Sequence, residues 1–174
     1  REGRRLIGPD RPFWAVVQCF GFGYETSRPT DTREPTYDEE RAATFAAIAE
    51  GATGIIYYCY HSLERSPRFE ERFAELDRIA AEVQTLVPIL SLPDAPRPAV
   101  VESGDLSVLT KQDTNRTWLI LASTRRTDQD VTLRLPFAPT AVRDRATGEA
   151  LDCAGDRLSL PFRALDARVL ELLP

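Results

Sequence analysis

Two strongly apolar stretches, separated by a polar loop and a well-capped helical segment, most constrain how this chain can fold. Residues 13–20 (FWAVVQCF) and 54–61 (GIIYYCYH) are rich in aromatic and β-branched side chains, which is typical of strands buried on both faces and therefore usually parallel. Between them, Thr36 and Glu39 match a capping box, and the helix that they begin closes before Gly51. The sequence therefore predicts a βαβ unit.

The loop that leaves the first predicted strand, residues 21–35, is polar and carries Glu25, Asp31 and Glu34. Loops at the carboxyl ends of parallel strands are where such folds place their functional sites. Cleavage of a glycosidic bond typically needs two carboxylates about 5–9 Å apart, and these three are the candidates. Arginines in the same loop favour ion-paired loop carboxylates over catalytic ones.

Composition and charge exclude several classes of function. The 22 basic residues are scattered and are outnumbered by 27 acidic ones, so we expect no nucleic-acid partner. No apolar run approaches the ~20 residues of a membrane helix, and the opening segment lacks the apolar centre of a signal peptide, so we expect no membrane partner. Localisation stays open, with a secreted or periplasmic parent protein as one alternative.

The few cysteines and the single histidine give no spacing typical of a metal site. Cys19, Cys59 and Cys153 are far apart, and the first two lie in the predicted strands, where we expect them to pack in the core. His61 has no partners that would complete a metal centre or a Ser/His/Asp triad. We therefore predict no metal and no cofactor.

A long amphipathic helix follows the second strand, and a change of pattern follows the helix. Ser66 and Pro67 match an N-cap and first turn, and the helix is expected to end near Pro88. Its apolar residues recur at spacings of three and four, and we expect its charged face to be solvated. The apolar residues are Phe69, Phe73, Leu76, Ile79, Ala80, Val83 and Leu86.

Three prolines in residues 92–98 predict a domain boundary, giving domains at 1–94 and 99–174. Beyond it, apolar residues alternate with period two and turn signals recur, which predicts an antiparallel β-sandwich. The fold class is thus α/β followed by all-β. The expected short strands are 100–102, 106–112, 117–122, 131–135, 140–144, 158–161 and 168–172.

Candidate binding residues gather at the ends of the two predicted strands. Gln18 is the one polar side chain in an apolar strand, and it needs hydrogen-bond partners, which a ligand or a neighbouring strand could supply. Tyr58 and Tyr60 share a strand face and could stack on sugar rings or pack in the core. His61 could bond a substrate hydroxyl or cap a loop. Trp118, in the second half, is interpreted as a core residue.

The stretches RPFWAVVQCFGF, REPTYDEERAATFAAIAEGATGIIYYCYHSL and LVPIL resemble the last two βα units of bacterial (β/α)8-barrel glycoside hydrolases of the broad β-galactosidase-like type. The resemblance implies that residues 13–20 are the seventh strand, that residues 54–60 are the eighth, and that a C-terminal β-sandwich follows. It also implies a carbohydrate substrate. Many such barrels place a nucleophilic glutamate at the end of the seventh strand, where this chain has Gln18, Cys19 and Phe20.

Two expectations follow, one about the extent of the chain and one about its activity. The chain starts at Arg1 without a methionine, and one βαβ unit has too few strands to cover itself, so we expect a C-terminal fragment that needs a missing N-terminal barrel portion. The fragment itself is expected to be inactive, with Gln18, Tyr58, Tyr60, His61 and Glu25 as substrate-binding residues of the parent. The alternative is a non-catalytic carbohydrate-binding or structural β-sandwich module.

Overall fold

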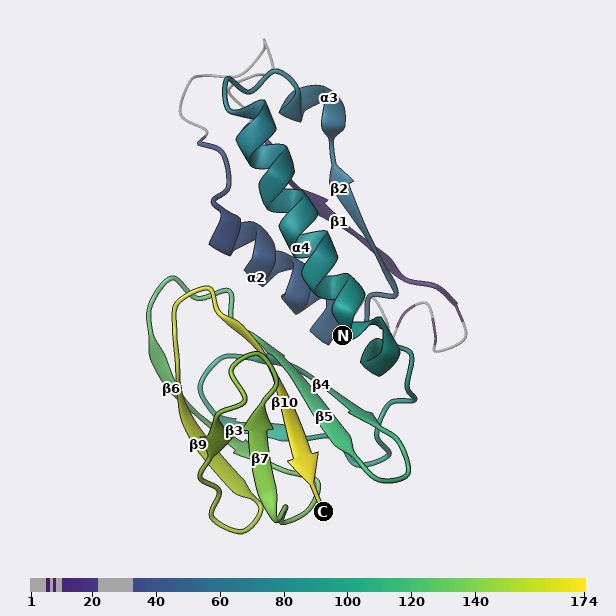
Figure 1. The fold of residues 1–174 in the computed structure, drawn as a ribbon, viewed down its shortest axis with the longest axis vertical. Coiled ribbons are helices and arrows are strands. Elements are labelled where there is room, and N and C mark those ends of the chain that lie inside the picture. Colours follow the sequence, from purple (N-terminus) through teal and green to yellow (C-terminus); the bar gives the residue numbers. More distant parts are fainter. Residues whose placement is uncertain (1–5, 7, 9–10, 22–32) are drawn as a thin grey trace.

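The computed structural model describes residues 6, 8, 11–21 and 33–174, and Figure 1 gives the arrangement of their helices and strands. The first half contains β1 (Trp14–Gln18), α2 (Tyr37–Ala49), β2 (Gly54–Tyr58), the short α3 (Tyr60–Leu63) and α4 (Phe69–Leu90). None of the helices in these ranges is both long and apolar enough to cross a membrane.

The predicted βαβ unit is present. Strands β1 and β2 pair in parallel, with Gln18 opposite Tyr58 at their carboxyl ends. The capping box at the start of α2 is also confirmed: the backbone N–H of Glu39 donates to Thr36 Oγ1 (3.3 Å), and the backbone N–H of Thr36 donates to Glu39 Oε2 (2.9 Å). These reciprocal bonds satisfy amides that the first helical turn leaves unpaired.

The expectation that both faces of the strands are buried was wrong. The face with Val17 and Tyr57 is turned toward the helices, and Tyr57 hydrogen-bonds to Thr44 of α2 (2.9 Å). The opposite face is open within the described chain, because the two strands have helices on one side only. Its apolar side chains retain large exposed fractions: Trp14 62%, Val16 63%, Ile56 41% and Tyr58 55%.

Helix α4 begins later and ends later than the sequence pattern predicts. Arg68, not Ser66, is its N-cap residue; Ser66 Oγ instead accepts a bond from the backbone N–H of Arg68 (3.0 Å). At the other end the helix continues through Pro88 to Leu90. A proline removes one helical hydrogen bond, but the burial of Leu86 and Ile89 on either side of it stabilises the last turn.

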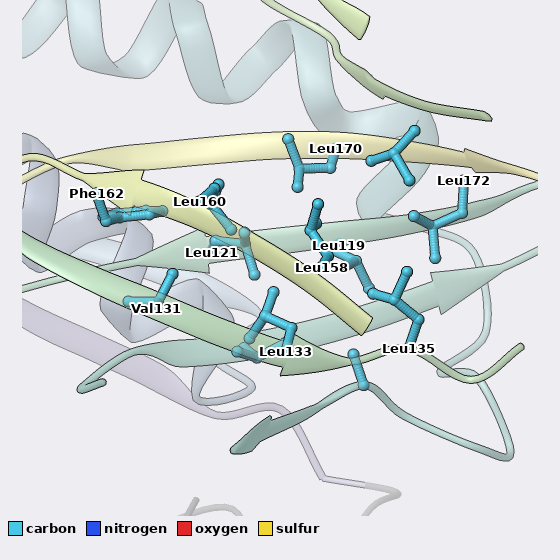
Figure 2. Close-up of a cluster of buried hydrophobic side chains, with 13 residues drawn as sticks. Leu119, Leu121, Val131, Leu133, Leu135, Leu158, Leu160, Phe162, Leu170 and Leu172 are labelled. Atoms are coloured by element: carbon cyan, nitrogen blue, oxygen red, sulfur yellow. The ribbon is translucent and has the colours of Figure 1, made fainter. Parts of the chain in front are cut away.

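The second half forms two antiparallel sheets packed face to face. One has the strand order β4-β5-β10-β7-β8 and the other β3-β6-β9. Figure 2 shows the leucine-rich core between them, with Leu119 and Leu170 from one sheet and Leu133 and Leu158 from the other. The strands are β3 (Val100–Ser103), β4 (Ser107–Gln112), β5 (Thr117–Ala122), β6 (Gln129–Arg134), β7 (Ala141–Asp144), β8 (Ala150–Leu151), β9 (Arg157–Phe162) and β10 (Ala167–Leu173).

The larger sheet is also covered on its outer face, by α2 and α4, as Figure 1 shows. Phe45 and Ile48 of α2 pack with Trp118 and Ile120 of β5, and every residue of β5 is buried. The interpretation of Trp118 as a core residue is thus confirmed, since its exposed fraction is 7%. A second hydrophobic core therefore joins the helices to the sandwich.

Arg41 of α2 adds polar contacts to this junction. Its guanidinium donates two bonds to Glu82 of α4 (2.8 and 2.6 Å) and one to the backbone oxygen of Ala167 in β10 (3.1 Å). We expected the charged face of α4 to be solvated, but two of its carboxylates, Glu75 and Glu82, bind arginines. Arg41 of α2 therefore connects α4 to the sandwich.

Replacing Phe45 by alanine is expected to lower the free energy of unfolding by about 3–5 kcal/mol, because it leaves a cavity between α2 and β5. Phe73→Ala is the matched control: this ring on α4 is 48% exposed, so the loss should stay below about 1.5 kcal/mol. Urea unfolding followed by circular dichroism measures both. Equal losses would contradict a shared core between the helices and the sandwich.

Candidate functional site

Gln18 and Tyr58 lie side by side at the carboxyl ends of β1 and β2, on the exposed face of the strand pair. The Gln18 amide nitrogen donates to the backbone oxygen of Phe20 (2.8 Å), which orients the side chain. The Tyr58 ring meets the Phe20 ring edge-on, with centroids 6.1 Å apart. An oriented amide beside an accessible aromatic ring can bond hydroxyl groups and stack on an apolar surface.

Tyr60 and His61 were placed on the second strand by the sequence pattern, but the structure has them in α3, because β2 ends at Tyr58. The Tyr60 ring packs edge-on against Phe69 of α4, with centroids 5.7 Å apart. His61 is exposed, and its ring nitrogens contact Glu64 (3.3 Å) and Arg65 (2.8 Å). The structure therefore places Gln18 beside Tyr58, whereas Tyr60 contacts α4 and His61 contacts the two residues that follow α3.

The loop carboxylates are only partly described. Glu25 and Asp31 lie outside the described residues. Glu34 is mostly buried, and one of its oxygens lies 3.8 Å from the guanidinium of Arg68. This contact agrees with an ion-paired loop carboxylate.

Beside this loop, Glu39 binds both Arg33 and Arg126, the latter reaching from the loop between β5 and β6 at 2.6 Å. The hydrogen bond from Arg33 is the main reason that the pKa of Glu39 falls to about 2. Glu39 is therefore ionised at neutral pH and bound to cations, and it is not a proton donor there.

Sequence reasoning missed a buried ion pair behind the strand ends. Arg72 of α4 and Glu40 of α2 are each 1% exposed, and the Arg72 guanidinium binds both Glu40 and Glu75. A signal was available, because Arg72 lies four and seven residues before Leu76 and Ile79 and thus on the buried stripe of α4. The partner of a buried arginine, however, cannot be read from its own helix.

Open cavities flank both edges of the strand pair. One, of about 580 Å³, lies beside β2 and between α2 and α4; Ile55, Val83 and Leu109 line it, and the Lys111–Asp94 ion pair (2.7 Å) stands at its border. The other, of about 670 Å³, follows β1 from Ala15 to Gln18 and the α2 alanines beside it. Within the described ranges, no three histidine, cysteine or acidic side chains are placed to hold a metal ion.

The thiol next to Gln18 lies in the interior. Cys19 is 1% exposed, and burial, followed by the nearby Glu40 carboxyl, raises its pKa to about 11. Cys59, expected to be buried, is partly exposed because it lies just beyond the end of β2, and its thiol donates to Ser62 Oγ (3.3 Å). Cys19 and Phe20, after β1, are thus buried, whereas Cys59, Tyr60 and His61, after β2, are partly or fully exposed.

Alkylation by iodoacetamide, followed by peptide mass spectrometry, should modify Cys19 at least about tenfold more slowly than the partly exposed Cys59. The reason is that Cys19 is 1% exposed and that its pKa of about 11 leaves little of the reactive thiolate. In urea the two thiols should react alike. Labelling of Cys19 in the folded protein at the rate of Cys59 would mean that the end of β1 is open.

Comparisons with known proteins bear on the fold. No protein-family model and no curated protein sequence matches the chain. Among solved structures, an α-fucosidase from Thermotoga maritima in complex with fucose matches with a TM-score of 0.60 and 17% identity over 95% of this chain and 41% of that one. A GH27 β-L-arabinopyranosidase from Geobacillus stearothermophilus matches with a TM-score of 0.56 and 16% identity over 92% of this chain and 36% of that one.

An α-amylase from Geobacillus thermoleovorans, complexed with acarbose, matches similarly, with a TM-score of 0.56 and 15% identity over 94% of this chain and 39% of that one. The chain spans about two fifths of the length of these enzymes. At this identity the likeness concerns the fold. The arrangement of two strands, two helices and a C-terminal β-rich region is thus one that occurs in glycoside hydrolases.

Proposed function

We propose that this chain is the C-terminal part of a glycoside hydrolase of the (β/α)8-barrel type, with β1 and β2 as the seventh and eighth barrel strands. In this proposal residues 1–94 belong to the barrel and residues 99–174 form the C-terminal sandwich domain. The β-galactosidase-like type is the form that the sequence favours. The structural neighbours support the broader class, because all three enzymes described above cleave glycosides.

The observation that carries the proposal is the open apolar face of β1 and β2. Trp14, Val16, Ile56 and Tyr58 remain exposed on one side, while helices cover the other. In a (β/α)8 barrel, helices surround the strands and the opposite face fills the barrel interior, so this asymmetry is what two excised βα units would have. Two strands alone form at best a marginally stable sheet, and they need further strands or further packing to be stable.

The edges of the strand pair support the same conclusion. Parallel sheets occur almost only where several strands are covered on both faces, and here both outer edges border open cavities. We propose that the missing N-terminal barrel portion supplies strands that pair with both edges and helices that enter these cavities. The apolar lining of the cavity beside β2, which includes Ile55, Val83 and Leu109, fits such an occupant.

Carbohydrate is the proposed substrate of the longer parent. Gln18 and Tyr58 lie at the carboxyl ends of the strands, where barrel enzymes build their sites. Gln18 would bond a sugar hydroxyl and Tyr58 would stack on the sugar ring, with Tyr60 and His61 at the border. Glu25 is proposed as a further binding residue, although it lies outside the described residues.

We propose that this chain alone does not turn over substrate. Among the described residues near the strand ends, Glu34, Glu39 and Glu40 are engaged by arginines rather than displayed as a pair across the open face. The catalytic acid and nucleophile would come from other barrel strands. The alternative of a carbohydrate-binding sandwich gains no support from Trp118, because helices cover it.

The barrel proposal predicts a change in the accessibility of Trp14. Variants Trp118→Phe and Trp14→Phe leave one indole each, and acrylamide quenching reports its exposure. In this chain Trp14 should quench readily and Trp118 poorly, since their exposed fractions are 62% and 7%. In the longer parent Trp14 should become several-fold less accessible; equally ready quenching there would contradict the proposal.

A second experiment tests the sugar site in the parent. Gln18→Ala should lower kcat/KM on aryl glycosides by about tenfold, the effect of losing one hydrogen bond of ordinary strength. Gln84→Ala, on the exposed face of α4, is the matched control and should leave kcat/KM unchanged. Unchanged kcat/KM in Gln18→Ala would remove that residue from the site, and hydrolysis by this chain alone would overturn its proposed inactivity.

A further inference from the structure

A buried polar network joins the N-terminal turns of α2 and α4 behind the strand ends. The guanidinium of Arg72 binds Oε1 of Glu40 with one terminal nitrogen and Oε2 of Glu75 with the other. The side chains of Arg72 and Glu40 are 1% and 0% exposed, so both are shielded from water. This contact crosses from α4 to α2, as the bonds between Arg41 and Glu82 also do.

Part of the network lacks hydrogen-bond partners. Glu40 Oε2, Arg72 Nε and Glu34 Oε1 are buried and have none within the part of the chain that the structure describes. An ionised carboxylate with one oxygen neither hydrated nor bonded is costly, whereas a protonated carboxyl loses far less on burial. Glu40 is the more deeply buried of the two carboxyls, with 0% of its side chain exposed against 12% for Glu34, so its unpartnered Oε2 is the place where a proton lowers the energy most.

The balance of charges also favours a proton on Glu40. Arg72 supplies one positive charge against the two carboxylates that it binds, so ionising both leaves a net negative charge around the buried guanidinium. Of the two carboxylates, Glu40 is the one fully shielded from water, since the side chain of Glu75 is 18% exposed. The groups that face Glu40 from the surrounding elements add no second buried cation. They are Arg72 and Glu75 from α4, Glu34 from the segment before α2, Tyr57 from β2, and Cys19 just after β1.

Of these neighbours, Tyr57 and Cys19 keep their protons at neutral pH. Burial is the largest influence on both groups: it raises the pKa of Tyr57 and, with Glu40, the pKa of Cys19. Burial likewise raises the pKa of Glu40 to about 8, outweighing the opposite effect of Arg72. Glu75 then provides the counter-charge for Arg72, and Glu40 accepts its hydrogen bond as a neutral acid.

We propose that Glu40 is protonated in the folded chain, so that Glu40, Arg72 and Glu75 form a proton-dependent latch between α2 and α4. Loss of the proton leaves an excess negative charge in the interface, and the first turns of the two helices separate to admit water. These turns adjoin the strand ends that carry Gln18 and Tyr58. The latch does not depend on the proposed function, because it involves only the contact between the helices.

The direction of the pH dependence follows from linkage. A carboxyl whose pKa is higher in the folded state than its ordinary value of 4.5 keeps its proton there when the unfolded chain has lost it. Its contribution to stability is complete below about pH 4.5 and is lost as the pH rises toward about 8. Acids bound to cations, such as Glu39 and Glu71, have lowered pKa values and act in the opposite direction at lower pH.

The test compares urea unfolding from pH 5 to 8, below the ordinary pKa of a cysteine thiol, in chains that carry His61→Asn, which removes the only histidine from this range. With Glu40 intact, the unfolding equilibrium constant should rise by at least about tenfold across this range, since each pH unit can contribute up to tenfold for one proton. With Glu40→Gln, which mimics the protonated acid, the rise should disappear. Glu71→Gln, an exposed α4 position, is the matched control and should keep it.

Infrared spectroscopy at pH 6.5 detects a protonated carboxyl directly in the native chain, so its main result does not depend on how well a variant folds. The carbonyl stretch of a protonated carboxyl should be present in the native chain and absent in Glu40→Gln. Glu75→Gln leaves Glu40 as the only carboxylate on Arg72, so the band should titrate away at lower pH. Absence of the band in the native chain, or its persistence in Glu40→Gln, would overturn the assignment of the proton to Glu40.

Hydrogen exchange tests the movement itself. After correction for intrinsic rates, amides in the first turns of α2 and α4 should lose protection between pH 6 and pH 9 in the native chain, but not in Glu40→Gln. Protection that is independent of pH in the native chain would show that the proton does not hold the helices together. Because activity is not measured, this result is separate from the fate of the proposed glycosidase parent.

Discussion

Burial of α2 on several sides is the constraint on which the rest of the structure depends. A 13-residue helix is marginal in water by itself, so its stability comes from its neighbours. Phe45 and Ile48 pack against the sandwich, Thr44 bonds to β2 through Tyr57, and Arg41 binds α4 and β10. The strand pair and the sandwich are held together because both pack on the same helix.

This arrangement gives the strand pair one protected face and one open face. The protected face contributes Val17 and Tyr57 to the layer beneath the helices, and the open face presents Gln18 and Tyr58 together at the strand ends. Parallel strands ordinarily owe their stability to cover on both faces. The same asymmetry that places the candidate site therefore also implies, under the proposed function, further βα units over the open face.

Local sequence signals predicted most of the elements and one pair of site residues. The Thr36 capping box, the alternation across residues 117–122 and the position of Gln18 at a strand end all depend on neighbours within a few residues. Where distant contacts compete, such signals fail. Pro88 did not end α4, because burial of the residues around it outweighs one lost hydrogen bond. His61 was predicted to lie in a strand but lies in the short helix α3.

The sequence by itself determined the order and type of most of the elements, though not the short α3 and β8, since periodicity, capping and turn residues act through the local backbone. Only the tertiary structure decided which face of each element is covered. It placed Trp118 under the helices rather than in the core between the two sheets, and it brought Arg72 to Glu40 across 32 positions. Burial and charge pairing depend on atoms far apart in the chain, and no local pattern contains that information.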